Sequence, residues 1–453
     1  MRRTILLSLS LVLSVFDGAQ ALRAQQQPPQ PKLETPVEVK PLRLEDLEQM
    51  ALRRNPSISQ ASASVRAAQA LRRQAGLYPN PTIGYTGDEI NRGSVFNYGE
   101  HGMFVEQRFV TGGKLGIAKK IAEQEIAQSQ AEVEAQRQRV LNSVRALYYQ
   151  ALGEQRLIQV RSQLVAIARR AVQTTSELQN VGQADRPDFL AVDIEAQRLE
   201  LGLVTARNAW DRTWRQLAAV TGNPDLRPSL LEGNIEELPK LAFDEALQKI
   251  FTESPELRVA QVGVTRSELA VSQAKAAVVP DLFARAGIHY NRERLELNNR
   301  PVGWQSSAEV GVQIPIFNRN QGNIAAARAD AERASLAVER TRLNLRSRLA
   351  AAYREYQDSV AAVDRYKTVM IPRAQEAYDL YLRNFRSMAA AYPQVIIAQR
   401  NLFQLQEDYV TTLVSAWRRT VEIQGLLLIE GAETSGHESG RAPLRTAGSD
   451  NND

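Results

Sequence analysis

Few residues of this 453-residue chain could carry out covalent or metal chemistry, and they lie far apart in the sequence. The absence of cysteine excludes disulfides, thiolate metal sites and cysteine nucleophiles. The histidines His101, His289 and His437 include no pair with the spacing of a zinc-binding helix. The Thr-Gly-Gly-Lys segment at 111–114 lacks the upstream glycine and the following serine or threonine of a phosphate-binding loop, and we interpret it as a strand-to-helix turn. We therefore expect no enzymatic activity, no cofactor and no metal site.

A group of charged residues lies beside a predicted turn between two helices. Asp185 and Asp188 are close to the start of the second helix, where carboxylates are favoured by the helix dipole. Arg186 and Pro187 lie between them, and proline fits a first turn because its missing N–H is harmless there. Gly182 suits the reversal, since glycine adopts a positive φ without strain. Helix capping accounts for one of the two acids but not obviously for both, so this segment is a candidate functional site.

The elements that position this turn belong to two similar halves of the chain, about 200 residues apart. Residues 42–58 predict a short helix, an Asn-Pro break and a second helix, and 241–257 repeat this order with Ser-Pro. The break Pro79-Asn80-Pro81 is matched by Pro280-Asp281. This period is far longer than the roughly 20–50 residues of a solenoid repeat, so it indicates two pseudo-equivalent halves.

The duplication predicts a domain layout. The first repeat, 42–240, has strands at about 82–92 and 102–110, a long helix at 113–180 and a return helix at 187–221. The second repeat, 241–430, has strands at about 282–291 and 304–316, a long helix at 323–387 and a return helix at 392–428. A signal peptide (1–24) and a flexible segment (25–41) precede the repeats, and we expect a disordered tail at 431–453.

The N-terminal residues have the order of a secretory signal. Arg2 and Arg3 precede an apolar run from Ile5 to Phe16, and a small-residue site follows at 19–21. The run of about 12 residues is too short to cross a bilayer of ~30 Å as a helix. We therefore expect a cleaved signal peptide and an exported chain. No later segment has 18 consecutive apolar residues, so a membrane-embedded form would have to be a closed β-barrel.

The predicted strands have one apolar and one polar face. In the last strand the apolar residues are Ala308, Val310, Val312 and Ile314. They alternate with Glu309 and Gln313, a pattern typical of a barrel strand with lipid outside and water inside. Tyr290 and Trp304 flank the loop between the strands, and we expect them at the membrane interface. The strands alone would also be compatible with a half-buried hairpin in a soluble domain.

The predicted long helices have heptad spacing. Apolar residues recur every seven positions at Ile126, Val133, Val140 and Leu147, in a second series that begins at Val144, and again at Leu349, Tyr356, Val363, Met370 and Ala377. A helix of roughly 60 residues is about 90 Å long, too long for an ordinary compact domain. Pro372 should bend or break the second one. A soluble coiled-coil dimer is the alternative, but it does not explain strands at matching places in both halves.

These features, in this order, resemble the TolC-type outer-membrane efflux family over residues 42–428. The resemblance is carried by the duplicated plan and by Asn55-Pro56, Pro79-Asn80-Pro81, the segment 107–114, Asn180-Val181-Gly182 followed by Asp188, and Ala398-Gln399-Arg400. Residues 315–323 are similar to the corresponding segment in outer-membrane components of heavy-metal efflux systems.

The resemblance implies a mainly α protomer with a β-barrel. Three duplicated protomers would form a 12-stranded outer-membrane β-barrel continued by a long periplasmic α-helical barrel. Physical reasoning agrees, because four strands cannot close a barrel in lipid and three chains supply about twelve. The implied function is a passive duct in a tripartite efflux system. Its partners would be a periplasmic adaptor (membrane fusion) protein, an inner-membrane pump of the RND type and outer-membrane lipid. The small, dispersed net charge of +5 gives no indication of a nucleic-acid partner.

The resemblance also implies that the two helix tips form the periplasmic aperture and dock the adaptor. The residues concerned are Gly182, Asp185, Arg186, Pro187 and Asp188 in the first tip and Met388, Ala389 and Pro393 in the second. The second tip departs from the family pattern, because Met388 replaces a usual glycine and Gln394 and Ile397 replace acidic residues. The alternative is a periplasmic adaptor or structural coiled-coil protein of an export complex. An adaptor would have one helical hairpin, whereas this sequence predicts two.

Overall fold

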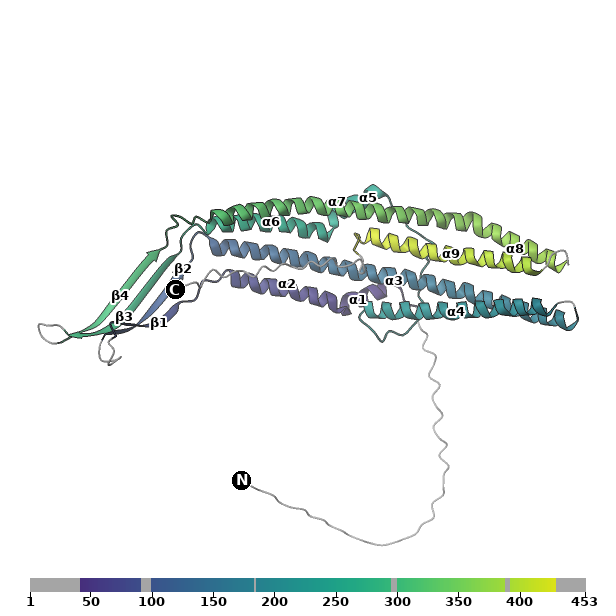
Figure 1. Ribbon diagram of the computed structural model, residues 1–453, viewed down its shortest axis with the longest axis horizontal. Helices are drawn as coiled ribbons and strands as arrows, with labels where there is room; N and C mark the ends of the chain where they lie inside the picture. Colours follow the sequence, from purple (N-terminus) through teal and green to yellow (C-terminus); the bar gives the residue numbers. More distant parts are fainter. Residues whose placement is uncertain (1–40, 91–98, 183–184, 295–299, 388–391, 429–453) are drawn as a thin grey trace, which may run out of the picture. The chain divides into compact units, whose positions relative to one another are not determined.

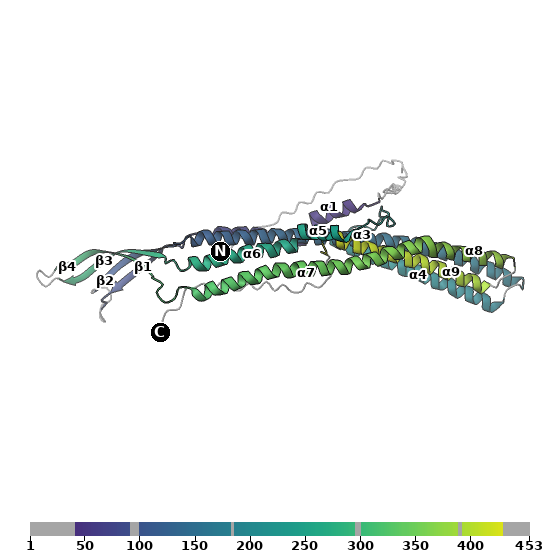
Figure 2. The ribbon, with the colours of Figure 1, turned by 90° about the horizontal axis from the view of Figure 1, so that it is seen from above.

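A computed structural model describes residues 41–90, 99–182, 185–294, 300–387 and 392–428, which form long helices and one sheet (Figures 1 and 2). The predicted signal peptide and C-terminal tail, most of the N-terminal segment, and Met388 and Ala389 lie outside these residues. Among the described helices, none combines the length and the apolar composition needed to cross a bilayer.

The same order of elements occurs twice. The first half contains α1 (Leu44–Arg54), α2 (Pro56–Ala75), β1 (Thr82–Asp88), β2 (Glu100–Phe109), α3 (Lys114–Asn180) and α4 (Arg186–Val220). The second contains α5 (Phe243–Glu253), α6 (Pro255–Ala276), β3 (Leu282–Arg294), β4 (Pro301–Val312), α7 (Gln321–Arg365), a π-helical turn η1 (Tyr366–Met370), α8 (Ile371–Arg386) and α9 (Tyr392–Gln424).

The predicted helix break at the start of each half is confirmed. The Asn55 side chain accepts a hydrogen bond of 2.9 Å from the backbone N–H of Ser57, and Pro56 opens α2. Ser254 accepts from the N–H of Leu257 in the same way, with Pro255 opening α6. The Asn55 amide also donates to the carbonyl oxygen of Val220 at 2.8 Å. This bond ties the break to the end of α4.

The four strands form one antiparallel sheet in the order β1-β2-β3-β4, so β1 and β4 are its edges (Figure 1). The register places apolar side chains on one face across every strand: Ile83, Tyr85, Met103, Val105, Ala284, Ala286, Ile288, Tyr290, Trp304, Ala308, Val310 and Val312. The other face carries most of the polar side chains, including Glu100, Glu106, Arg285, His289, Gln305 and Glu309. The sheet is therefore two-faced from edge to edge.

The last strand is shorter than the sequence predicted. It ends at Val312, whose partner Leu282 is the first residue of β3, so no β3 residue remains to pair with the chain beyond. Pro315, which has no N–H to donate to a ladder, follows three residues later. Ile314, which we expected to face lipid from within the strand, therefore lies outside it.

Two buried clusters hold the helices together. The first surrounds Trp214, whose ring N–H donates to the carbonyl oxygen of Leu226 at 2.9 Å, and includes the heptad residues Val140 and Val144 of α3. The second surrounds Leu345 and Leu349 of α7. Helix α3 contacts α2, α4, α6 and α9, so it belongs to the packing of both halves. The fully buried heptad positions explain why so long a helix is stable.

The long helix of the second half, predicted over 323–387, is interrupted just before Pro372, where the sequence predicted a bend or a break. It changes to a π turn at Tyr366–Met370, where the backbone N–H of Ile371 donates to the carbonyl oxygen of Tyr366. Pro372 cannot donate, and in a regular α-helix its ring would clash with the carbonyl of Thr368. A wider turn immediately before the proline relieves this conflict. The proline therefore acts on the residues before it.

Candidate functional site: the strand-to-helix junction and the helix tips

The Thr-Gly-Gly-Lys segment forms the turn that joins β2 to α3, as predicted. Gly112 and Gly113 have φ values of +65° and +68°, and Gly113 occupies the N-cap position of α3. A side chain at Gly112 would also come within 2.9 Å of the Val279 Cβ atom. Two consecutive left-handed residues and this close approach require glycine, so the segment has a structural role.

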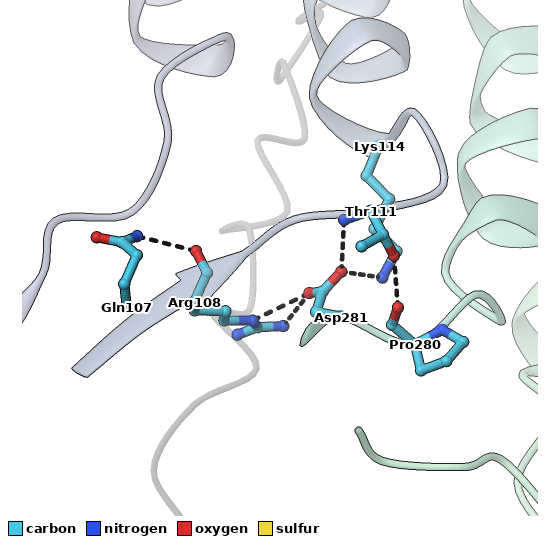
Figure 3. A network of polar contacts seen from close by, with 6 residues as sticks. All are labelled: Gln107, Arg108, Thr111, Lys114, Pro280 and Asp281. Carbon is cyan, nitrogen blue, oxygen red and sulfur yellow. Dashed lines mark hydrogen bonds and ion pairs between the residues drawn. The ribbon is translucent and has the colours of Figure 1, made fainter. Parts of the chain in front are cut away.

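Asp281, immediately before β3, is the centre of a polar network at this junction (Figure 3). Its Oδ1 accepts hydrogen bonds from the Nζ of Lys114 at 2.7 Å and from the backbone N–H of Thr111 at 3.1 Å. Its Oδ2 accepts from the Nε and Nη2 of Arg108 at 3.0 and 2.6 Å. The Thr111 hydroxyl donates to the carbonyl oxygen of Pro280. One carboxylate thus joins the start of β3 to the end of β2 and the start of α3.

The surroundings of Asp281 favour its charged form. Its side chain is only 9% exposed, and this burial raises the pKa of the carboxyl. The hydrogen bonds from Lys114, from the Thr111 N–H and from Arg108 oppose that effect and hold the pKa below its usual value. Asp281 is therefore ionised at neutral pH, and its role is to hold β2, β3 and α3 together at this junction. Sequence reasoning identified the segment 107–114 but missed its partner, because these residues are separated by about 170 positions from Asp281.

The first helix tip lies where α3 ends and α4 begins. Gly182 has a φ of +73°, and its N–H donates to the carbonyl oxygen of Gln179 at 3.1 Å. Asp185 occupies the N-cap position of α4, yet its side chain makes no capping hydrogen bond; only its carbonyl oxygen accepts, from the N–H of Phe189. The four residues from Asp185 to Asp188 are exposed. The Asp185 carboxylate is thus not used to cap α4.

The second tip lies between α8 and α9, at the same end of the helices as the first (Figures 1 and 2). Pro393 is exposed in the first turn of α9. Met388 and Ala389 lie outside the described residues, so the structure describes Gly182, the charged group at 185–188 and Pro393, but not the complete predicted set.

Two ion pairs near the tips connect α9 to the first half. Glu195 of α4 accepts from the Nε of Arg400 at 2.9 Å, and Arg161 of α3 donates to both carboxylate oxygens of Glu407 at 2.7 and 3.1 Å. Glu195, Arg400 and Glu407 line a groove of about 250 Å³ between α3, α4 and α9, which is lined also by Leu164, Val192 and Phe403. Arg400 is part of a motif recognised in the sequence, but nothing in the sequence indicated Glu195 as its partner.

The duplicated chain, with a two-faced sheet continued by long helices, has the architecture expected of an outer-membrane channel subunit. The family model described as outer membrane efflux protein matches residues 47–223 and 246–426, one segment in each half. The chain therefore belongs to the outer membrane efflux protein family, and the family expected from the sequence motifs is confirmed.

Similar proteins agree with this assignment. The cobalt-zinc-cadmium resistance protein CzcC of Cupriavidus metallidurans is 24% identical over 387 residues, covering 85% of this chain and 90% of that protein. The solved structure of CusC is similar with a TM-score of 0.72 and 16% identity, covering 85% of this chain and 91% of CusC. That of VceC from Vibrio cholerae has a TM-score of 0.67 at 18% identity and covers 85% and 96%. The expected fold, that of an outer-membrane channel protomer, is thereby confirmed.

Proposed function

We propose that three copies of this chain form a passive outer-membrane duct of a tripartite efflux system. The observation that carries this proposal is the four-stranded sheet, which has an apolar face spanning every strand and whose edge strands, β1 and β4, pair with no further strand among the residues that the structure describes. An apolar face suits lipid, but open edges in lipid leave backbone groups without partners. Three sheets joined edge to edge supply about twelve strands, an even number within the range of such barrels.

The proposed partners are a periplasmic adaptor protein and an inner-membrane pump of the RND type. We place the adaptor at the helix tips, because Asp185, Arg186 and Asp188 are exposed and the Asp185 carboxylate makes no capping bond. Gly182, Pro187 and Pro393 would shape the two turns. Met388 and Ala389 would complete the docking surface in the second tip. Cleavage of the signal peptide would precede assembly in the outer membrane.

The proposed cargo is a divalent metal ion. This is supported by the similarity to CzcC, which is named for resistance to cobalt, zinc and cadmium, and by the likeness of residues 315–323 to heavy-metal efflux components. A wide, water-filled duct selects weakly, so specificity would be set by the pump.

The assembly is tested by extracting the protein from membranes in detergent and measuring the mass of the complex. A trimer is the expected result, and a stable, water-soluble monomer would contradict the proposal. The cargo is tested by expressing the protein with its pump and adaptor in a metal-sensitive strain. Restored growth in zinc or cobalt, but not in a drug, is expected.

A further inference from the structure

The junction between β2 and β3 has a counterpart at the two open edges of the sheet. Because the chain is duplicated, β4 is equivalent to β2, and β1 is equivalent to β3. If copies join edge to edge, the seam between β4 of one copy and β1 of the next repeats the seam between β2 and β3 within one chain. The Asp281 network at the helix end of the internal seam therefore predicts which residues meet at the external one.

The strand pairing fixes two of the equivalent positions. Pro79-Asn80 aligns with Pro280-Asp281, so Asn80 is the counterpart of Asp281. Thr82 pairs with Glu106, and its counterpart Phe283 pairs with Gly311. Glu106 therefore corresponds to Gly311. Arg108 lies two residues beyond Glu106, and Gln313 lies two residues beyond Gly311, so these two residues also correspond.

The helix starts fix the third position. Gly113 is the N-cap of α3 with a φ of +68°, and Asn320 is the N-cap of α7 with a φ of +57°. The residue after each cap opens the helix, so Lys114 corresponds to Gln321. Between the strand and the cap, the second half is longer by two residues.

All three charges of the internal network are replaced by amides at the external positions. The carboxylate becomes Asn80, and the two cations become Gln313 and Gln321. All three amides are exposed in the single chain, whereas Asp281 is largely buried. Loss of only the acid or only the bases would leave an uncompensated charge in a closed seam, which is strongly unfavourable. The combined replacement is the pattern expected of residues that share one contact.

We infer that Asn80 of one copy meets Gln313 and Gln321 of the next copy and closes the helix end of the seam by uncharged hydrogen bonds. This inference rests on the proposed trimer. Amides both donate and accept, so three of them can satisfy one another without a charge. The contact between copies is then indifferent to salt and to pH, unlike the ionic contact within each copy.

Cysteine crosslinking tests the predicted proximity, and the chain has no cysteine of its own to interfere. Membranes containing Asn80→Cys with Gln313→Cys are treated with a short bis-methanethiosulfonate reagent. Covalent trimers on a denaturing gel are expected. The matched control pairs Asn80→Cys with Gln305→Cys, on the same strand and face but about 26 Å further along, and should give monomers.

A charge-exchange experiment gives an independent reading. Asn80→Asp alone should lower the temperature at which the trimer dissociates, and adding Gln321→Lys should restore it while making it fall with added salt. If trimers form but the crosslinking pair gives no more product than its control, or the second substitution gives no rescue, the inference is wrong. If no trimer forms in the unmodified protein, the proposed function fails instead.

Discussion

Helix α3 and the segment α7–η1–α8 begin at equivalent positions but are built differently. Helix α3 continues for 67 residues without a break, about 100 Å of helix. Its counterpart is interrupted by a π turn before Pro372. Val165 lies as far beyond Gly113 as Pro372 lies beyond Asn320, and Val165 is buried whereas Pro372 is exposed. The two halves thus have the same topology, but only the second has a proline, Pro372, preceded by a π turn in its long helix.

The largest effect is expected from placing a proline in the uninterrupted helix. Val165→Pro removes the N–H that bonds to the carbonyl of Arg161 and introduces a clash with it, at a cost of about 3 kcal/mol or more. A buried side chain is lost as well. The variant should show much less heat-resistant trimer and a lower helical signal in circular dichroism. Pro372→Ala is the matched control and should change stability little. Equal tolerance of proline at both positions would show that the helices do not differ mechanically.

A second experiment asks whether the halves remain equivalent in the sheet. Val105 and Val310 occupy corresponding positions on the apolar face. Arginine at a lipid-facing position of a barrel costs about 2–4 kcal/mol near the bilayer midplane and less near the interfaces. Val105→Arg and Val310→Arg should therefore lower stability in urea by similar amounts. Arginine at Gln305 on the polar face should be tolerated, and similar damage from all three would place the sheet in a soluble core.

A smaller effect is expected at the charged junction, together with a pH dependence. Asp281→Asn should cost roughly 1–3 kcal/mol, because Lys114 loses its partner in a partly buried site. The folded-state pKa of Asp281 is lowered, so its stabilisation is fully present above the unfolded pKa of about 3.9 and is lost as pH falls through the folded value. The melting temperatures of the unmodified protein and of Asp281→Asn should differ at neutral pH and converge as the pH falls through the lowered pKa of Asp281. A difference in melting temperature that stays constant with pH would show that the Asp281→Asn substitution acts through side-chain shape and not through charge.

The smallest change in stability is expected at the first helix tip. Asp185→Ala and Asp188→Ala remove exposed side chains, and the Asp185 carboxylate makes no capping bond, so stability should change by no more than about 0.5 kcal/mol. Single-channel recordings should nevertheless show altered conductance or cation preference. Substitution of Gln394, at the less acidic second tip, should leave the conductance unchanged. Unaltered conductance in the double alanine variant would show that Asp185 and Asp188 have no role in conduction and that the first tip is only a turn.

Features set by local patterns were predictable from the sequence. The heptad residues Val140 and Val144 are fully buried, and the Thr-Gly-Gly-Lys segment is a strand-to-helix turn. Contacts between distant residues were not predictable. The partners of Asp281 and the Glu195–Arg400 ion pair connect positions whose proximity is decided only by the complete fold. The end of β4 depends on where its partner strand begins, so Ile314 was misplaced although the alternation itself was read correctly.

The π turn also changes the phase of the heptad pattern. Leu349, Tyr356 and Val363 are buried seven residues apart, but the next position in that series, Met370, is 38% exposed. Beyond the turn, the half-buried residues Ile371, Tyr378 and Phe385 are again seven apart. The interval across the turn is therefore eight, since the wider turn takes up one extra residue. A sequence alignment that extends the heptad through Pro372 without a one-residue gap would assign every contact of α8 to the wrong neighbour.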